Sequence, residues 1–171
     1  MILTVGHGAQ TADELGETLR TAGVEVLFDI RRYPGSRRHP QFNAGEMSRW
    51  LGDYGVDYRW VESLGGRRQP AADSPNVGLD NDQFRAYADH MATDEFRAGM
   101  AEVLEAARSR RVAVMCSETV WWRCHRRLLA DHLELVEGEV VEHLFPGGRR
   151  YPHAATEGAA VVDGRVVYPA P

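Results

Sequence analysis

The sequence contains no lysine and, among its 171 residues, only two cysteines, Cys116 and Cys124. Two cysteines are too few for the disulfide framework of a small secreted domain, so we expect both to be reduced. No apolar run approaches the roughly 20 residues that cross a bilayer. The N-terminus also lacks the basic flank and the apolar length of a signal peptide. These absences predict a cytoplasmic protein with no membrane partner.

All 20 basic residues are arginine, and the formal net charge is −5. A negative total disfavours binding of nucleic acid over the whole surface. Codon usage alone explains an arginine-only composition, so the clustering of the arginines is the more informative feature. Planar guanidinium groups suit the recognition of phosphate and carboxylate groups. The clusters are Arg31-Arg32, Arg37-Arg38, Arg67-Arg68, Arg123 with Arg126-Arg127, and Arg149-Arg150.

Five short apolar runs alternate with amphipathic helical segments, and the chain length suits one domain. Strands joined by helical crossovers form a mainly parallel sheet with helices on both faces. We therefore expect a single-domain α/β fold with a five-stranded, mainly parallel sheet over residues 1–145. The predicted strands are 2–5, 24–30, 56–61, 112–116 and 139–145, and the predicted helices are 12–22, 44–54, 84–91, 94–107 and 123–136.

Residues 146–171 form a C-terminal extension with a different pattern. Within it, Asp163-Gly164 separates two runs rich in β-branched residues. An Asp-Gly pair in that setting is a strong signal for a two-residue hairpin turn. We therefore predict a C-terminal β-hairpin outside the five-stranded sheet.

Glycines and chemically reactive side chains follow four of the predicted strands. The carboxyl ends of parallel strands meet at one edge of a sheet, where α/β proteins bind their ligands. We therefore expect one crevice at that edge. The strand ends carry Gly6-His7-Gly8, then Asp29 with Arg31, Arg32 and Ser36, then Gly65-Gly66-Arg67, and finally Cys116 with Glu118, Cys124 and His125.

Basic residues are densest at the start of the last predicted helix. A helix that begins near Arg123 carries three arginines in its first turn, where the helix dipole disfavours cations. An anion in front of the helix reverses that penalty, because it attracts both the free N–H groups and the guanidinium groups. Arg126 and Arg127 are therefore candidate anion ligands. The alternative is a solvated basic face.

The same segment offers groups for catalysis. A helix start lowers the pKa of a nearby thiol, which makes Cys124 a candidate nucleophile; the alternative is a small packed core cysteine. His125 falls on the inward face of the predicted helix and is a candidate acid or base. Glu118 is either its carboxylate partner or the counter-ion of an arginine. His7 lies between two glycines, which permit close approach of the backbone to a ligand.

Two other interpretations concern metals and aromatic rings. No Cys-x-x-Cys is present, and seven residues separate the two cysteines, so the spacing is not that of a zinc knuckle. We expect no metal and no cofactor. Trp121-Trp122 beside the arginines suit stacking on a base or ring, and otherwise belong to the core or to an interface. The side chains of types that zinc accepts are Cys116, Cys124, His125 and His7.

An ordered set of short motifs resembles domain-of-unknown-function family 488. The resemblance runs from about Leu3 to His143 and implies a compact α/β protein whose crevice residues act as a unit; it names no substrate. The C-terminal hairpin lies outside it, and Trp121-Trp122 depart from it. The motifs are Thr4-Val-Gly-His7, Asp29-Ile-Arg31 with Pro34 and Ser36, Phe42, Leu64-Gly65-Gly66, Tyr87-Ala-x-x-Met91, and Met115-Cys-x-Glu118 with Cys124-His125-Arg126.

These features predict a crevice with enzyme-like chemistry that binds a phosphate- or carboxylate-bearing ligand, such as a nucleotide or a nucleic-acid component. A non-catalytic nucleic-acid-binding module and a metal-dependent hydrolase are the alternatives. The predicted catalytic groups are His7, Glu118, Cys124 and His125, and the predicted ligand-binding residues are Gly6, Asp29, Arg31, Arg32, Ser36, Gly65, Gly66, Arg67, Cys116, Arg126 and Arg127.

Overall fold

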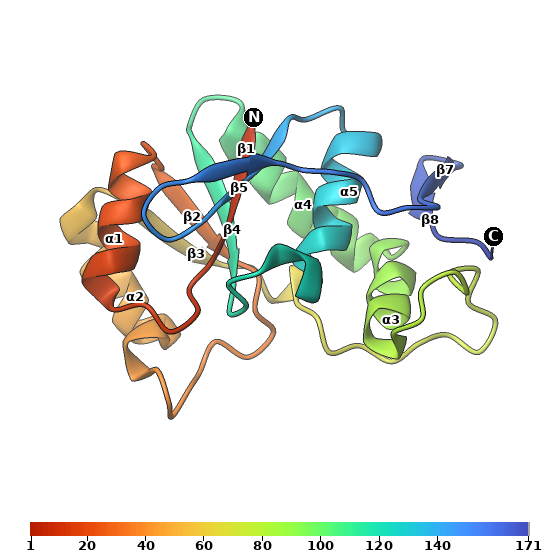
Figure 1. Ribbon diagram of the computed structural model, residues 1–171, viewed down its shortest axis with the longest axis horizontal. Helices are drawn as coiled ribbons and strands as arrows, with labels where there is room; N and C mark the ends of the chain where they lie inside the picture. Colours follow the sequence, from red (N-terminus) through yellow and green to blue (C-terminus); the bar gives the residue numbers. More distant parts are fainter. Residues whose placement is uncertain (171) are drawn as a thin grey trace.

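A six-stranded sheet with the order β3-β2-β4-β1-β5-β6 forms the centre of the computed structural model, which describes residues 1–170 (Figure 1). The first five strands in the chain are parallel, so the predicted parallel sheet is confirmed. The strands are β1 (Ile2–Gly6), β2 (Val26–Asp29), β3 (Asp57–Trp60), β4 (Val112–Cys116), β5 (Val141–Leu144) and β6 (Arg150–Pro152).

The sixth strand, β6, is absent from the sequence-based expectation. It pairs antiparallel with β5, with His143 opposite Tyr151. Gly147 and Gly148 both have positive φ angles, of 80° and 85°, and make the reversal between the two strands. A strand of three residues is too short to show the alternation by which a sequence reveals a strand. β6 also ends in proline, which has no N–H group to donate to a neighbouring strand.

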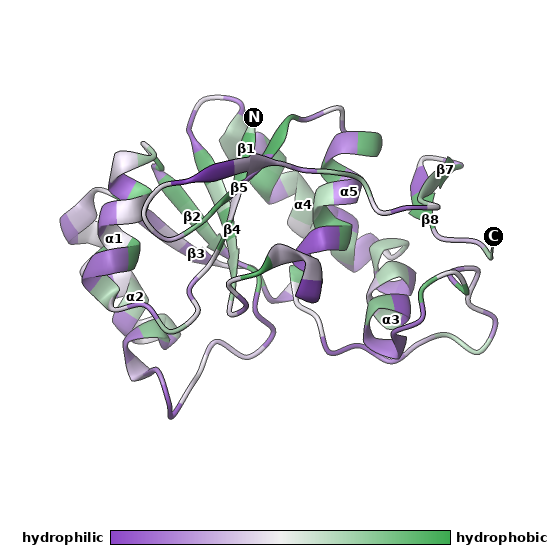
Figure 2. Cartoon of the chain, viewed as in Figure 1, coloured by the Kyte–Doolittle hydropathy of each residue, from purple (hydrophilic) through white to green (hydrophobic). Residues whose placement is uncertain are grey.

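Helices cover both faces of the sheet, as predicted. α1 and α2 pack on one face around Leu15, Leu19 and Met47, and α3, α4 and α5 lie on the other (Figure 1). The central strands are apolar along their length (Figure 2), as strands buried on both faces must be. The helices are α1 (Ala12–Thr21), α2 (Ala44–Trp50), α3 (Asp82–Met91), α4 (Asp94–Ala107) and α5 (Arg126–Leu135), with 3-10 turns η1 (Pro40–Phe42), η2 (Leu51–Tyr54), η3 (Glu62–Leu64) and η4 (Trp121–Arg123).

The C-terminal hairpin forms as the Asp-Gly signal predicts. β7 (Ala160–Val162) and β8 (Arg165–Val167) pair antiparallel around Asp163 and Gly164, whose φ angles are 50° and 72°. Two consecutive positive φ angles are what a tight hairpin turn requires. No helix among residues 1–170 is both long and apolar enough to cross a membrane.

The C-terminal extension packs onto the sheet and helices through a buried polar chain. The Asp131 carboxylate of α5 accepts hydrogen bonds from the hydroxyl of Tyr168 at 2.7 Å and from the backbone N–H of Thr156 at 2.9 Å. His153 lies between Asp131, at 2.8 Å, and His143 of β5, at 2.9 Å. The extension thus supplies side chains to the interior, while the domain boundary at residue 145 stays a prediction.

Candidate functional site

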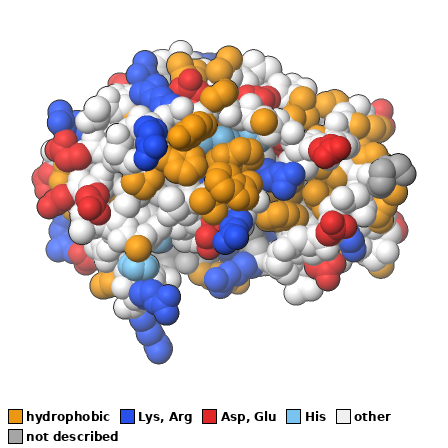
Figure 3. Space-filling view, viewed as in Figure 1, with side chains coloured by type: hydrophobic (Ala, Val, Ile, Leu, Met, Phe, Trp, Pro, Cys, Tyr) orange, Lys and Arg blue, Asp and Glu red, His pale blue; other side chains and the backbone are white. Residues whose placement is uncertain are grey.

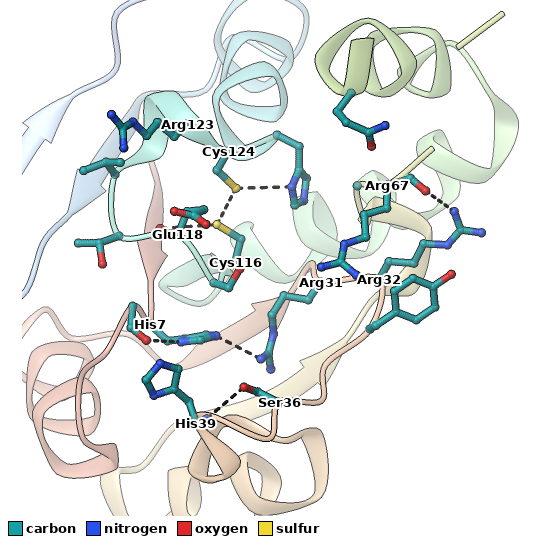
Figure 4. Close-up of a pocket in the computed structure, with 18 of the residues that line it drawn as sticks. His7, Arg31, Arg32, Ser36, His39, Arg67, Cys116, Glu118, Arg123 and Cys124 are labelled. Carbon is teal, nitrogen blue, oxygen red and sulfur yellow. Dashed lines mark hydrogen bonds between the residues drawn. The ribbon is translucent and has the colours of Figure 1, made fainter. Parts of the chain in front are cut away.

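A cavity of about 640 Å³ opens at the carboxyl ends of the parallel strands (Figure 4). Gly6 pairs with Cys116, and Asp29 pairs with Met115, so the ends of β1, β2 and β4 are level at this edge. The predicted convergence of the strand-end motifs is confirmed. The lining residues are His7, Gly8, Arg31, Arg32, Tyr33, Gly35, Ser36, Arg38, His39, Gly66, Arg67, Gln83, Phe84, Cys116, Ser117, Glu118, Thr119, Val120, Arg123, Cys124 and His125.

The cavity brings most of the predicted site residues together. All four predicted catalytic groups line it, and so do six of the predicted ligand-binding residues. Five others are not among the lining residues. The lining set comprises His7, Glu118, Cys124, His125, Arg31, Arg32, Ser36, Gly66, Arg67 and Cys116, and the outer set comprises Gly6, Asp29, Gly65, Arg126 and Arg127.

Two cysteines and a histidine meet in the cavity wall. The Sγ atom of Cys124 lies 2.6 Å from the Sγ atom of Cys116 and 3.5 Å from Nδ1 of His125 (Figure 4). Nε2 of His125 lies 3.1 Å from the carbonyl oxygen of Ile30. A carbonyl only accepts, so Nε2 carries the proton and Nδ1 of the neutral ring is free to accept one. The histidine is therefore oriented to take a proton from Cys124.

The surroundings separate the acidities of the two thiols. Burial raises the pKa of Cys116 well above its usual value. Burial acts in the same direction on Cys124, but the hydrogen bond from Cys116 and the charge of Arg126 outweigh it and lower the pKa of Cys124 below its usual value. Burial also lowers the pKa of His125, which keeps the ring neutral. Cys124 is thus the more acidic of the two thiols.

The loop between the two cysteines is held against β1 by close backbone contact. A Cβ atom on Gly6 would lie 1.8 Å from the carbonyl oxygen of Glu118, so only glycine fits there. The N–H groups of His7 and Gly8 donate to the carbonyl oxygens of Cys116 and Ser117 at 3.1 and 2.9 Å. The glycines around His7 therefore fix the loop that carries the cysteine pair.

The predicted helix from residue 123 to residue 136 is wrong at its start. Arg123 ends the 3-10 turn η4, the backbone of Cys124 is extended, and α5 begins only at Arg126. Arg123 is therefore not in the first turn of α5. The interruption brings Cys124 to the cavity wall.

Arg126 and Arg127 point away from the cavity. Arg126 is 1% exposed, and its Nη2 donates to the carbonyl oxygens of Glu118 and Thr119 at 2.8 and 3.2 Å. Nε of Arg127 donates to the hydroxyl of Thr156 at 2.7 Å. Arg126 therefore braces the cysteine loop from behind and supplies positive charge near Cys124, and Arg127 anchors the C-terminal extension.

His7 and Arg31 form a fixed unit on the opposite wall. Nδ1 of His7 lies 2.9 Å from the carbonyl oxygen of Gly8, and its Nε2 lies 3.3 Å from Nη1 of Arg31 (Figure 4). Burial lowers the pKa of His7 to about 4, so the ring is neutral and accepts from Arg31. Asp29, beneath the wall, holds the same guanidinium through Nε at 2.8 Å. Both ring nitrogens of His7 therefore have partners: Nδ1 fixes the ring on the Gly8 carbonyl oxygen, and Nε2 helps to position Arg31.

Positive charge dominates the cavity wall, which carries five arginines against a single carboxylate, that of Glu118. Tyr33 lies against two of them, with the guanidinium carbons of Arg32 and Arg67 5.6 and 5.9 Å from its ring centroid. The buried Nε of Arg32 has no hydrogen-bond partner in the structure. Arg67 has a φ angle of 58°, a conformation that side-chain-bearing residues rarely adopt. Such backbone strain clusters at functional sites.

Sequence reasoning did not identify several lining residues as parts of the site. Gln83 and Phe84 come from the start of α3, which the strand-end argument does not consider. Tyr33, Arg38 and His39 lie on the loop after β2, where the polar loop and its prolines give the only signal. Arg123 was expected at a helix start and instead reaches the wall from η4.

The metal interpretation gains no support from the geometry. Within residues 1–170, no group of three or more histidine, cysteine, aspartate or glutamate side chains is placed to hold a metal ion. Catalytic zinc requires at least three such ligands. The two cysteines and His125 instead contact one another directly.

Comparison with known proteins identifies the family of the chain. A family described as a domain of unknown function, DUF488, matches residues 11–133. The matched range contains the arginine loop, both cysteines and His125, and it leaves out Gly6-His7-Gly8 and the C-terminal extension. No curated protein and no solved structure matches the chain.

Proposed function

Because the chain belongs to the DUF488 family, whose description names no activity, we propose a function from the geometry of the cavity. The cavity binds a phosphate- or carboxylate-bearing ligand, and Cys124 attacks that ligand as a thiolate nucleophile. The observation that carries this proposal is the position of Cys124 Sγ, 3.5 Å from the accepting nitrogen of His125 in an arginine-rich wall. A nucleophile beside an oriented base is the recurring arrangement of covalent catalysis.

The residues divide the work in this proposal. His125 takes the proton of Cys124, and the sulfur forms a bond to the electrophilic carbon or phosphorus. The leaving group departs with its electron pair and takes the proton from His125. Water then cleaves the sulfur–ligand bond and restores the thiolate. Arg31, Arg32 and Arg67 hold the anionic group during both steps.

Glu118, His7 and Ser36 have supporting places in the proposal. Among the described residues, Glu118 is the only carboxylate on the wall, and it is available to accept a proton from the water that cleaves the sulfur–ligand bond. His7 holds Arg31 in position rather than acting as the base, since both its nitrogens have partners. The hydroxyl of Ser36 accepts from the backbone N–H of His39 at 3.0 Å and fixes the loop.

Alkylation kinetics test the nucleophile. We expect iodoacetamide at pH 7 to modify Cys124 faster than Cys116, because both thiols line the cavity but only Cys124 has a lowered pKa. Phosphate should slow this modification more than chloride does at equal ionic strength. Peptide mapping by mass spectrometry reads out each thiol. Equal rates at the two thiols, or no difference between phosphate and chloride, contradict the proposal.

Arg67→Gly separates ligand binding from folding. Glycine suits the left-handed backbone at residue 67, where φ is 58°, so this variant should fold at least as well as the wild type. We expect saturable stabilisation of the wild type by phosphate and loss of most of that gain in the variant. Gly52→Ala, at a residue that does not line the cavity and has open space where the Cβ would be added, is the control. An unchanged response in Arg67→Gly removes Arg67 from the anion site.

A non-catalytic nucleic-acid-binding module remains the second candidate, and it rests on the arginines of the wall together with the exposed ring of Trp122. Turnover decides between the two. Hydrolysis of p-nitrophenyl phosphate or p-nitrophenyl acetate that disappears in Cys124→Ser supports the enzyme. Binding that is unchanged in Cys124→Ser, without any turnover by the wild type, supports the module.

A further inference from the structure

A second cavity, of about 690 Å³, lies beside the first one and is almost entirely apolar. Hydrophobic side chains gather at the centre of the face seen in Figure 3, over η4 and β6 of Figure 1. We call this cavity the aromatic groove. Its lining residues are Trp121, Trp122, Phe145, Pro146, Arg149, Tyr151 and Pro152.

The aromatic groove and the arginine cavity share one short turn. Trp121 and Trp122, in the middle of the segment 120–123, line the groove. Val120 and Arg123, which flank them, line the arginine cavity. The two cavities therefore border the same turn, η4.

The rings of the groove are positioned in advance. Trp121 stacks on His143, with centroids 4.1 Å apart and planes 7° apart, and stands perpendicular to Trp122. Trp122 and Phe145 lie 6.5 Å apart at 33°. Both rings line the groove, so a planar ring that enters it meets two aromatic side chains.

Two of the rings that line the groove are exposed within the part of the chain that the structure describes. Trp122 is 48% exposed and Tyr151 is 47% exposed. Among residues 1–170, Arg149 is the only charged residue that lines the groove, and no carboxylate does. The groove thus suits a flat, weakly polar ring attached to a negative group, which the neighbouring arginines attract.

We propose that the aromatic groove binds the base of a nucleotide unit whose phosphate occupies the arginine cavity. This inference rests on the proposed anion-binding function and names its ligand class. The same unit occurs as a free nucleotide and as one residue of a single-stranded nucleic acid. Stacking of a base on an aromatic side chain is sequence-tolerant, so the groove selects the ring and not a particular base.

Equilibrium binding at constant ionic strength tests this inference, with four probes: inorganic phosphate, adenosine, adenosine monophosphate and an oligo(dA) of ten nucleotides. We expect the nucleotide to bind at least tenfold more tightly than phosphate or adenosine alone. Trp122→Ala should lose at least tenfold of nucleotide binding and none of phosphate binding. Trp122→Phe keeps a stacking ring and should stay within threefold of the wild type. Val162→Ala, on the exposed β7–β8 hairpin, is the control.

The probes also identify the source of the nucleotide. Binding of the oligonucleotide that exceeds that of the mononucleotide and weakens steeply with salt indicates a nucleic-acid strand. Equal binding of the two indicates a free nucleotide.

Three results overturn the inference. They are nucleotide binding no tighter than that of phosphate, nucleotide binding unchanged in Trp122→Ala, and a dimer that Trp122→Ala converts to a monomer without affecting nucleotide binding. With any of these three results, the proposed function still holds if the wild type binds phosphate and Arg67→Gly does not. Absence of phosphate binding in the wild type instead contradicts the proposed function itself.

Discussion

The carbonyl oxygen of Glu118 lies directly against the Cα atom of Gly6, in the space that a Cβ atom would fill. This contact joins the end of β1 to the loop that carries Cys116 and Cys124. Because the obstructing atoms belong to backbone, neither side can rotate away. The architecture of the cysteine site therefore depends on a glycine that carries no chemistry of its own.

Gly6→Ala is expected to destabilise the protein and to displace the cysteine loop. The added methyl group would lie 1.8 Å from the Glu118 oxygen, and overpacking of this kind costs about 1–3 kcal/mol or more. Urea unfolding measures the loss of stability, and the alkylation rate of Cys124 measures the displacement. Gly52→Ala, with nothing within 4 Å of its added Cβ, should be neutral or stabilising. Equal stability of the two variants would contradict the contact.

Cys116 and Cys124 are expected to form an intramolecular disulfide under a mild oxidant. Their Sγ atoms lie 2.6 Å apart, and the lowered pKa of Cys124 supplies the attacking thiolate. Diamide takes up the two electrons and two protons that the thiols lose. Two reactive thiols should then disappear, with a mass decrease of about 2 Da and recovery on reduction. Cys116→Ser should give no intramolecular product; two thiols that persist in the oxidised wild type contradict the geometry.

Stability is expected to fall as the pH drops below about 6.5. Burial lowers the folded-state pKa of His7 to about 4 and that of His143 to about 3. Between these values and pH 6.5, the unfolded chain therefore binds more protons than the folded chain does. Each histidine contributes a slope of about 1.4 kcal/mol per pH unit between its two pKa values. Denaturant unfolding at several pH values from 7 to 4.5 measures the slope.

A single substitution checks the assignment of this pH dependence. His143→Gln should flatten the slope by about one proton, whatever its effect on stability at pH 7. A slope equal to that of the wild type would show that His143 titrates normally in the folded protein.

Tyr168→Phe is expected to lower the free energy of unfolding by about 1.5–3 kcal/mol, because the buried carboxylate of Asp131 loses the hydroxyl that donates to it at 2.7 Å. Chemical unfolding measures the change. Tyr151→Phe removes an equivalent hydroxyl from an exposed position and should stay within about 0.5 kcal/mol of the wild type. Similar losses in the two variants would mean that the buried chain through Asp131 contributes no more than a surface hydroxyl.

The parallel sheet and the position of the cavity are the parts of the structure that the sequence predicted best. Apolar runs such as Val112–Cys116 are buried on both faces, and their periodicity differs from that of the helices. Strand direction then places His7, Arg31 and Cys124 at one edge, since parallel strands share their carboxyl end. Short elements were predicted poorly: β6 was missed, and the interruption before α5 was read as continuous helix.

The sequence by itself determined the fold class, the hairpin at Asp163-Gly164 and the edge where reactive side chains meet, because these follow from local periodicity and turn geometry. Only the tertiary structure decided the role of each side chain. Arg126 lies three residues after Arg123, yet one braces a loop and the other faces the cavity. That difference arises at one extended residue, Cys124, whose side chain contacts Cys116 at the end of β4, a contact between separate elements that no local pattern predicts.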